Sequence, residues 1–191
     1  MQNKKQLKEI AEIVVGYTFR SALQEQKNGE ISVIQAKNVI NNAYVDDKKL
    51  SKIARRDYHT SARVKKNDIF ITSRGVFRAG FIDKEISDSI ASSSMYILRL
   101  KDDKIKPEYL MIYLNSNIGQ KAIQEKATGG AIKTILKKDL ENIVVRMDDI
   151  ETQNQIISLY KNNKRQQEML SKKKDLVNNI IQNVINNLIT A

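Results

Sequence analysis

The chain has 191 residues, which is long enough for one domain with a sizeable hydrophobic core. Its 33 Lys and Arg outnumber 22 Asp and Glu, so the formal net charge is +11, and it has no cysteine. These counts exclude disulfides and thiolate metal sites, and no apolar run approaches the ~20 residues of a membrane-spanning helix. The N-terminus is broken by charged residues and is not typical of a signal peptide. We therefore expect a soluble, cytoplasmic protein without membrane association.

Short strands separated by polar loops are predicted for the first third of the chain. An apolar segment at 7–15 becomes β-like toward its end, and an Asn-Gly turn signal precedes a predicted strand at 31–36. Residues 37–63 have a weak pattern and several basic side chains. This segment is predicted to be surface loop with a helical turn or two.

A β-hairpin is predicted next. Its strands lie at 69–73 and 76–82, with the turn at Ser73 to Gly75. A further strand at 95–100 follows a run of three serines and alternates in polarity only weakly.

Helical signals begin at the single proline, Pro107, which suits the first turn of a helix because its missing N–H costs nothing there. A second helix is predicted at 119–127, a helical turn at 137–140 and a strand at 143–147. The alternation of strands and helices predicts a mixed α/β domain over residues 1–149.

The remaining residues, 150–191, predict one long helix. Steps of four and three residues from Ile156 are apolar at seven of ten positions, and no glycine or proline interrupts them. At ~1.5 Å per residue the helix would be roughly 58 Å long, beyond the flank of a small domain. We predict an intermolecular coiled coil with a helix of another molecule, and the alternative is a terminal helix folded along its own domain. The predicted seam consists of Ile156, Tyr160, Leu170, Val177, Ile181, Val184 and Leu188.

The positive charge is concentrated in the predicted domain. From Glu151 onward the chain has six basic and three acidic residues, so residues 1–150 carry +8 of the net +11. This distribution favours a polyanion as the domain's partner and a protein as the helix's partner, and a merely solvated basic surface is the alternative.

Catalytic signatures are missing from the sequence. The single histidine, His59, has no cysteine to join it in a metal site, and the acid pair at Asp46-Asp47 has a spacing to lysine that chance provides in so basic a chain. Gly75 and Gly80 have the interval of a phosphate-binding loop, but Phe81 stands where that loop needs lysine. We predict a non-catalytic protein without its own metal or cofactor.

Double-stranded DNA is the predicted polyanion. Arg74 and Arg78 lie at or just beyond the predicted hairpin turn, where arginine can donate paired hydrogen bonds to guanine and serine can adapt to either base or phosphate. The other basic candidates would contact phosphate or lie in polar loops, and a solvated turn is the alternative for the hairpin residues. The candidate DNA-binding residues are Lys37, Arg55, Arg56, Arg63, Ser73, Arg74, Arg78 and Lys133.

The order of these segments resembles the DNA-specificity subunits of Type I restriction–modification systems. The likeness covers nearly the whole chain and depends on the order of short, degenerate patterns. They are Gly16-Tyr17-Thr18, KKNDIFITSRG at 65–75, PEYLMIYLNSNIGQKAI at 107–123, TGGAIKTILKKDLENIVV at 128–145 and a Gln-rich helix start at 150–157. One departure is that the family usually has a proline shortly before the long helix, where this chain has Met147 and Asp148.

The resemblance implies a function and a set of partners. Full-length members carry two target-recognition domains, each followed by a long helix, and this chain resembles one such half. A homodimer would then read a split target with inverted half-sites. The implied partners are modification subunits, which methylate adenine, and a restriction motor subunit; S-adenosylmethionine, ATP and Mg would bind to these partners.

Three alternatives remain open from the sequence. The chain could be a scaffold protein whose basic domain binds an acidic partner, or a stand-alone nuclease. Within the family, it could be a truncated specificity half that only competes for modification subunits.

Overall fold

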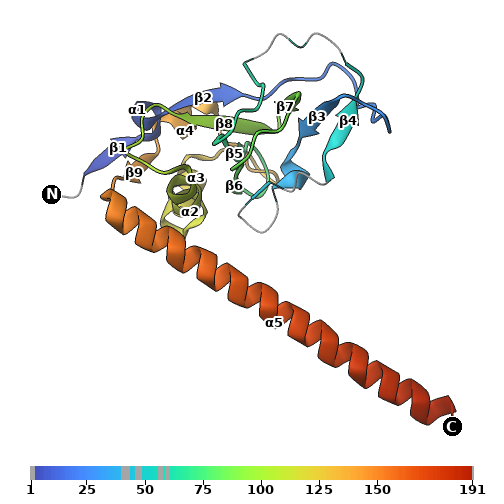
Figure 1. Cartoon of the computed structure of the whole chain (residues 1–191). Helices are drawn as coiled ribbons and strands as arrows, with labels where there is room; N and C mark the ends of the chain where they lie inside the picture. The colour runs from blue at the N-terminus through green and yellow to red at the C-terminus, as the bar shows by residue number, and fades with distance from the viewer. Residues whose placement is uncertain (1–2, 40–43, 46–48, 56–57, 59–60, 191) are drawn as a thin grey trace. The chain divides into compact units, whose positions relative to one another are not determined.

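The computed structural model describes residues 3–39, 44–45, 49–55, 58 and 61–190 (Figure 1). The chain divides into two compact units, Met1–Gln153 and Asn154–Ala191. The first unit contains all the strands of the described residues, together with four short α-helices, and the second contains most of one long helix. The predicted mixed α/β domain followed by a long helix is confirmed.

A four-stranded antiparallel sheet forms the centre of the first unit. Its strand order is β2-β8-β5-β6, with bounds Ala11–Val15, Met95–Leu100, Ile69–Thr72 and Ala79–Phe81. The predicted hairpin is present as β5 and β6, with Ile69 opposite Phe81. Every residue of β5 is buried, so this strand lies in the hydrophobic core.

The hairpin loop is longer than the predicted turn, because β6 begins at Ala79 rather than at residue 76. Gly75 adopts a φ of 75°, which favours glycine and bends the chain. The hydroxyl of Thr72 accepts a hydrogen bond from the Arg78 N–H (2.9 Å) and donates one to the Val76 carbonyl (2.7 Å). These bonds hold residues 73–78 as a loop instead of extending the strand.

A three-stranded sheet packs beside the first and differs from the prediction. Its order is β4-β3-β7, with bounds Ser51–Ile53, Ile31–Ile34 and Ser89–Ala91, and β3 pairs with β7 in parallel. Only β3 was predicted, and it ends early because Ala36–Asn38 form a 3-10 helix, η1. Strand β4 lies in the segment predicted as loop, since three residues are too few to show alternation.

The first and last strands of the domain pair with each other and so bring its two ends together. Strand β1 (Lys4–Gln6) pairs with β9 (Val144–Arg146) in a small antiparallel sheet, and helix α1 (Leu7–Ile10) follows β1 directly. Helix α4 (Lys137–Glu141) precedes β9, as the sequence predicted. The pairing fixes the chain just before the long helix begins.

Helices α2 (Pro107–Asn115) and α3 (Asn117–Lys126) cover one flank of the central sheet. Pro107 occupies the first turn of α2, as predicted. The side-chain amide of Asn115 donates to the carbonyl of Ala79 (2.8 Å) and accepts from its N–H (2.9 Å). This amide therefore satisfies both backbone groups of Ala79 at the edge of the sheet and ties α2 to β6.

The long helix α5 runs from Ile150 to Thr190 and confirms the predicted start. Asp149 caps it by accepting hydrogen bonds from the backbone N–H of Thr152 (2.7 Å) and from its hydroxyl (3.1 Å). Of the predicted seam residues, Ile156 and Tyr160 are half-buried, and the others are exposed. No helix among the described residues is both long and apolar enough to span a membrane.

Candidate nucleic-acid interface

A loop of three serines is hydrogen-bonded to three segments, two of which carry candidate DNA-binding residues. We call Ser92 to Ser94, between β7 and β8, the serine loop. Its backbone N–H at Ser93 donates to the Tyr17 carbonyl (2.8 Å), and its carbonyl at Ser94 accepts from the Ser73 N–H (2.9 Å). The Ser94 hydroxyl accepts from the Ala36 N–H (3.4 Å). The serine loop thus fixes the hairpin loop and the start of η1, which carries Lys37, on one side of the domain.

The hairpin loop is joined to a second loop that follows α3. We call residues 73–76 and 128–135 the paired loops. The Gly75 N–H donates to the Lys133 carbonyl (2.8 Å), and the Ile135 N–H donates to the Ser73 carbonyl (3.0 Å). Between these bonds, Arg74 pairs with Thr134 in an antiparallel bridge. The structure therefore brings Arg74 and Lys133, two independent sequence candidates, to neighbouring positions on two joined loops.

Backbone hydrogen bonds also fold the second loop on itself. Thr128 and Thr134 exchange two backbone hydrogen bonds of 2.9 and 2.8 Å. Gly129, with a φ of 110°, allows the turn between them, and a Cβ there would lie 2.6 Å from the Ile132 carbonyl oxygen. The loop that carries Lys133 is consequently held in shape before any ligand binds.

The candidate residues of the hairpin loop differ in exposure. Arg74 is exposed, whereas Ser73 is only 8% exposed and its hydroxyl donates to the Ser93 carbonyl (3.4 Å). Arg78 is half-buried, and its guanidinium donates to the Val39 carbonyl (3.4 Å). Ser73 and Arg78 therefore hold the loop in place, and Arg74 is the side chain of the three that is free to reach a ligand.

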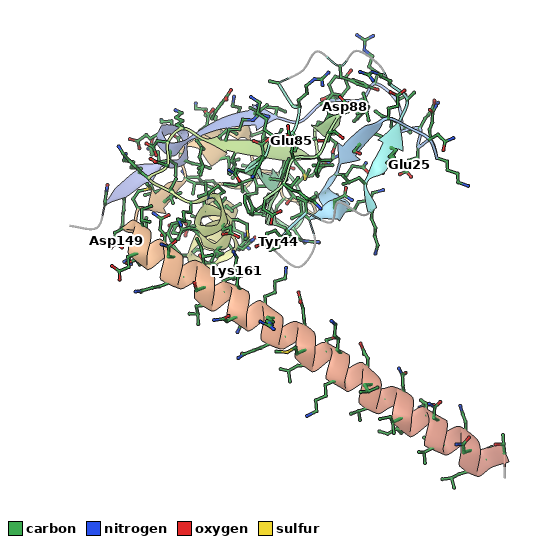
Figure 2. The ribbon with its side chains drawn as sticks, in the orientation of Figure 1. Glu25, Tyr44, Glu85, Asp88, Asp149 and Lys161 are labelled. Carbon is green, nitrogen blue, oxygen red and sulfur yellow. The ribbon has the colours of Figure 1, made fainter. Side chains whose placement is uncertain are left out.

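Three other basic candidates form ion pairs at the surface. Lys37 pairs with Glu25 (3.3 Å), Arg55 with Glu30 (3.1 Å) and Arg63 with Asp88 (3.7 Å). Figure 2 labels two of these carboxylates, Glu25 and Asp88, at the end of the domain that holds the three-stranded sheet. The hydrogen bond from Arg55 to Glu30 raises the pKa of the arginine. Exposed pairs of this kind contribute little to stability, so phosphate can compete for the cations.

Arg74 and Lys133 differ from these residues in their electrostatic surroundings. Within the described part of the chain, neither forms an ion pair with a carboxylate. Their charge is therefore available to an incoming anion without a competing internal partner. Arg56, also a candidate, lies outside the described residues, as do His59 and the acid pair at Asp46-Asp47.

Sequence reasoning missed a buried ion pair that supports the basic segment near Arg63. Arg99 on β8 donates to both carboxylate oxygens of Asp68 (3.0 and 3.2 Å) and to the Ser61 and Arg63 carbonyls. Burial raises the pKa of the Asp68 carboxyl, although the hydrogen bonds from Arg99 act in the opposite direction. The signal was an arginine on the face of β8 that also carries Met95 and Ile97, since a charge there requires a partner.

Among the described residues, no group of three or more His, Cys, Asp or Glu is placed to hold a metal ion. The chemistry on this surface is therefore cationic and hydrogen-bonding. A domain whose exposed cations on hydrogen-bonded loops have no ion-pair partner among the described residues, and whose chain continues into a long helix, has the features of a nucleic-acid recognition module.

Comparison with known proteins identifies the family. Residues 2–185 match the family model of the Type I restriction modification DNA specificity domain. The chain belongs to this family, whose members are DNA-recognition components rather than enzymes. The resemblance inferred from the sequence is thus confirmed.

Individual relatives agree with this assignment. The chain is 32% identical over 123 residues to the Type I restriction enzyme EcoBI specificity subunit of Escherichia coli, a match that covers 62% of this chain and 25% of the relative. It therefore spans about a quarter of that curated protein.

Solved structures share the fold at low sequence identity. The crystal structure of the Type I restriction-modification S subunit from M. genitalium matches with a TM-score of 0.59 at 16% identity, covering 90% of this chain and 41% of that one. A structure of the Type I R-M system, which addresses its assembly and conformational transition, matches with a TM-score of 0.65 at 17% identity, covering 88% and 39%. The HsdS subunit from Thermoanaerobacter tengcongensis matches with a TM-score of 0.57 at 15% identity, covering 89% and 39%.

Proposed function

We propose that the chain binds double-stranded DNA sequence-specifically through the paired loops. The observation that carries this proposal is the backbone join between the two loops that carry Arg74 and Lys133. Both side chains are exposed, and neither forms an ion pair with a carboxylate of the described residues. Cations held in this way can meet base edges or phosphate at little cost in side-chain and loop ordering. The ion-paired residues Lys37, Arg55 and Arg63 would add phosphate contacts that do not depend on sequence.

The proposed biological role is that of a specificity half-subunit in a Type I restriction–modification complex. The chain would direct adenine methylation and restriction, both of which partner subunits would perform. S-adenosylmethionine, ATP and Mg would be bound by those partners, and the chain itself would need no cofactor. The family match and the similarity to the EcoBI specificity subunit support this role.

A homodimer through α5 would supply the second recognition domain. The matched solved structures are more than twice as long as the aligned part of this chain, which covers 41% or less of each. Two copies would cover most of that length. The exposed apolar side chains of the C-terminal half of α5, among them Leu170, Val177 and Ile181, support association through this helix.

A binding titration tests the proposal. Purified chain is titrated with a randomised duplex and with a duplex enriched by selection, each at several salt concentrations. We expect the enriched duplex to bind more tightly and log affinity to fall against log salt by about 0.9 per neutralised phosphate. Equal affinity for both duplexes would contradict sequence-specific recognition.

A second candidate role within the family is that of a specificity half that only competes for modification subunits, and the partial coverage of the matched relatives is compatible with it. Methylome sequencing separates the two roles in a host that expresses the chain together with its modification subunit. A new methylated motif supports the half-subunit. Loss of existing methylation without a new motif supports the competitor.

A further inference from the structure

Two aliphatic side chains lie in the open on the paired loops. Val76 and Ile132 are each 66% exposed. Single exposed apolar residues are common on protein surfaces and need no explanation. These two are different because they belong to loops that are otherwise composed largely of glycine and polar or basic residues, and because backbone hydrogen bonds join those loops.

The register of the join relates the two side chains. Ser73 is hydrogen-bonded to Ile135, Arg74 bridges Thr134, and Gly75 is hydrogen-bonded to Lys133. Val76 follows Gly75 and Ile132 precedes Lys133, so each adjoins the last hydrogen-bonded pair of the join on its own loop. The two apolar side chains thus lie within two residues of Arg74 and Lys133, which have no ion-pair partner among the described carboxylates.

A two-stranded antiparallel element fits the major groove of B-DNA. The apolar group that this groove displays is the C5-methyl of thymine, which aliphatic side chains contact. We infer that Val76 and Ile132 form an apolar contact that recognises a thymine methyl group, beside the base or phosphate contacts of Arg74 and Lys133. This inference rests on the proposed function and names the part of the DNA that these residues read.

Substitutions at Val76 and Ile132 test the inference, and the measured quantity is the base preferred at each position of the bound DNA. Full-length chains carrying Val76→Ser or Ile132→Ser are compared with wild type by selection from randomised duplexes. The matched control is Ile118→Ser, because Ile118 is 69% exposed but lies on α3, outside both loops. We expect the two loop variants to lose thymine preference at one position or two adjacent positions by about fourfold, the effect of burying one methyl-sized group. The control should keep the wild-type preferences.

A second experiment changes the DNA and not the protein, and Ile132→Ser serves as its comparison. The selected duplex is remade with deoxyuridine in place of each thymidine in turn, which removes only the C5-methyl group. Wild type should bind about fourfold more weakly when the recognised methyl is missing. The Ile132→Ser chain should bind the two duplexes equally, because it has lost the contact.

Several results would overturn the inference. They are a selected target without thymine, deoxyuridine bound as well as thymidine by wild type, loop variants with unchanged preferences, or the same change in the Ile118→Ser control. A wild-type chain that binds all sequences alike would instead contradict the proposed function. A selective wild type whose preferences do not depend on Val76 or Ile132 would contradict this inference alone.

Discussion

The backbone N–H of Gly75 donates a 2.8 Å hydrogen bond to the carbonyl oxygen of Lys133, and so connects a hairpin loop with the loop after α3. The two segments are far apart in the sequence. Their connection places Arg74 and Lys133 at neighbouring positions and gives the proposed DNA interface a fixed backbone. Substitutions on the paired loops should change which sequence is bound, whereas substitutions of ion-paired cations elsewhere should change how strongly any sequence is bound.

Arg74→Ala should relax sequence choice. The guanidinium can donate two hydrogen bonds to one base, and losing such a contact costs about 1.4 kcal/mol or more of discrimination, a factor of about ten. The measurement is competition between the selected duplex and single-base variants of it. Lys121→Ala, which removes an exposed cation from α3, serves as the control. A uniform loss of affinity for all duplexes would assign Arg74 to phosphate contact instead.

Arg55→Ala should weaken binding to all sequences alike and reduce the salt slope by about 0.9, because one phosphate contact is lost. Glu30→Gln should have the opposite effect, since it removes the carboxylate that pairs with Arg55 at 3.1 Å. Both are measured by salt titration with a randomised duplex. If neither variant changed the slope, Arg55 would lie outside the interface.

Val177→Asp combined with Ile181→Asp should produce monomers. Both side chains are exposed on α5 and belong to the predicted seam, where buried carboxylates would oppose association. Light scattering measures the mass. Asn178→Asp with Gln182→Asp adds the same charge at the same spacing, but at polar positions, and should leave the dimer intact. An unchanged mass in the first variant would refute association through this helix face.

Arg99→Ala should lower the free energy of unfolding by about 3 kcal/mol, because the nearly buried Asp68 carboxylate loses its partner. Urea denaturation measures the loss. Adding Asp68→Asn removes the unpaired charge, so the double variant should recover part of the stability. A double variant as unstable as the sum of the two single variants would show that the ion pair itself is not the cause.

Asp149 should make the start of α5 sensitive to acid. The backbone N–H of Thr152, and then its hydroxyl, lower the pKa of this carboxyl below its ordinary value of 3.8. A lowered pKa in the folded chain means that the cap stabilises the helix above pH 3.8 and stops doing so as pH falls through the lowered value. The melting temperature of wild type should therefore exceed that of Asp149→Ala at neutral pH and converge with it in stronger acid.

Asp149→Asn provides the control for this titration. Asparagine also caps helices but does not ionise. Its melting temperature should stay above that of the alanine variant across the same pH range. A wild-type advantage over Asp149→Ala that persisted unchanged in strong acid would show that the carboxylate charge is not what stabilises the helix start.

The sequence predicted elements that have strong local signals. Pro107 fixed the start of α2, the apolar run at 69–72 with its following glycine indicated the hairpin, and the uninterrupted heptad spacing indicated α5. Strands β1, β4 and β7 were missed because each has three residues and, unlike β6 and β9, none lies within a longer apolar run. Strand β7 also pairs in parallel with β3 across a long stretch of chain, and no local pattern records such a pairing.

The candidate site was predicted residue by residue but not as an arrangement. Arg74 and Lys133 were both identified as polar loop positions, yet their proximity depends on backbone hydrogen bonds, which leave no side-chain signature. The burial of Ser73 and the contact of Arg78 with Val39 likewise depend on how the loop folds back. The exposure of these side chains depends on the serine loop, which is hydrogen-bonded to the hairpin loop, and a local sequence pattern does not record that contact.

The hydrogen bonds that the structure shows between the two loops are made by main-chain atoms, and Gly75 is the residue whose conformation favours a particular side chain, since its φ is 75°. Mutation can therefore exchange the side chains at positions 74, 76, 132 and 133 without breaking the bonds that join them. The DNA sequence that the proposed interface prefers could therefore change by point substitution while the backbone of both loops stays the same.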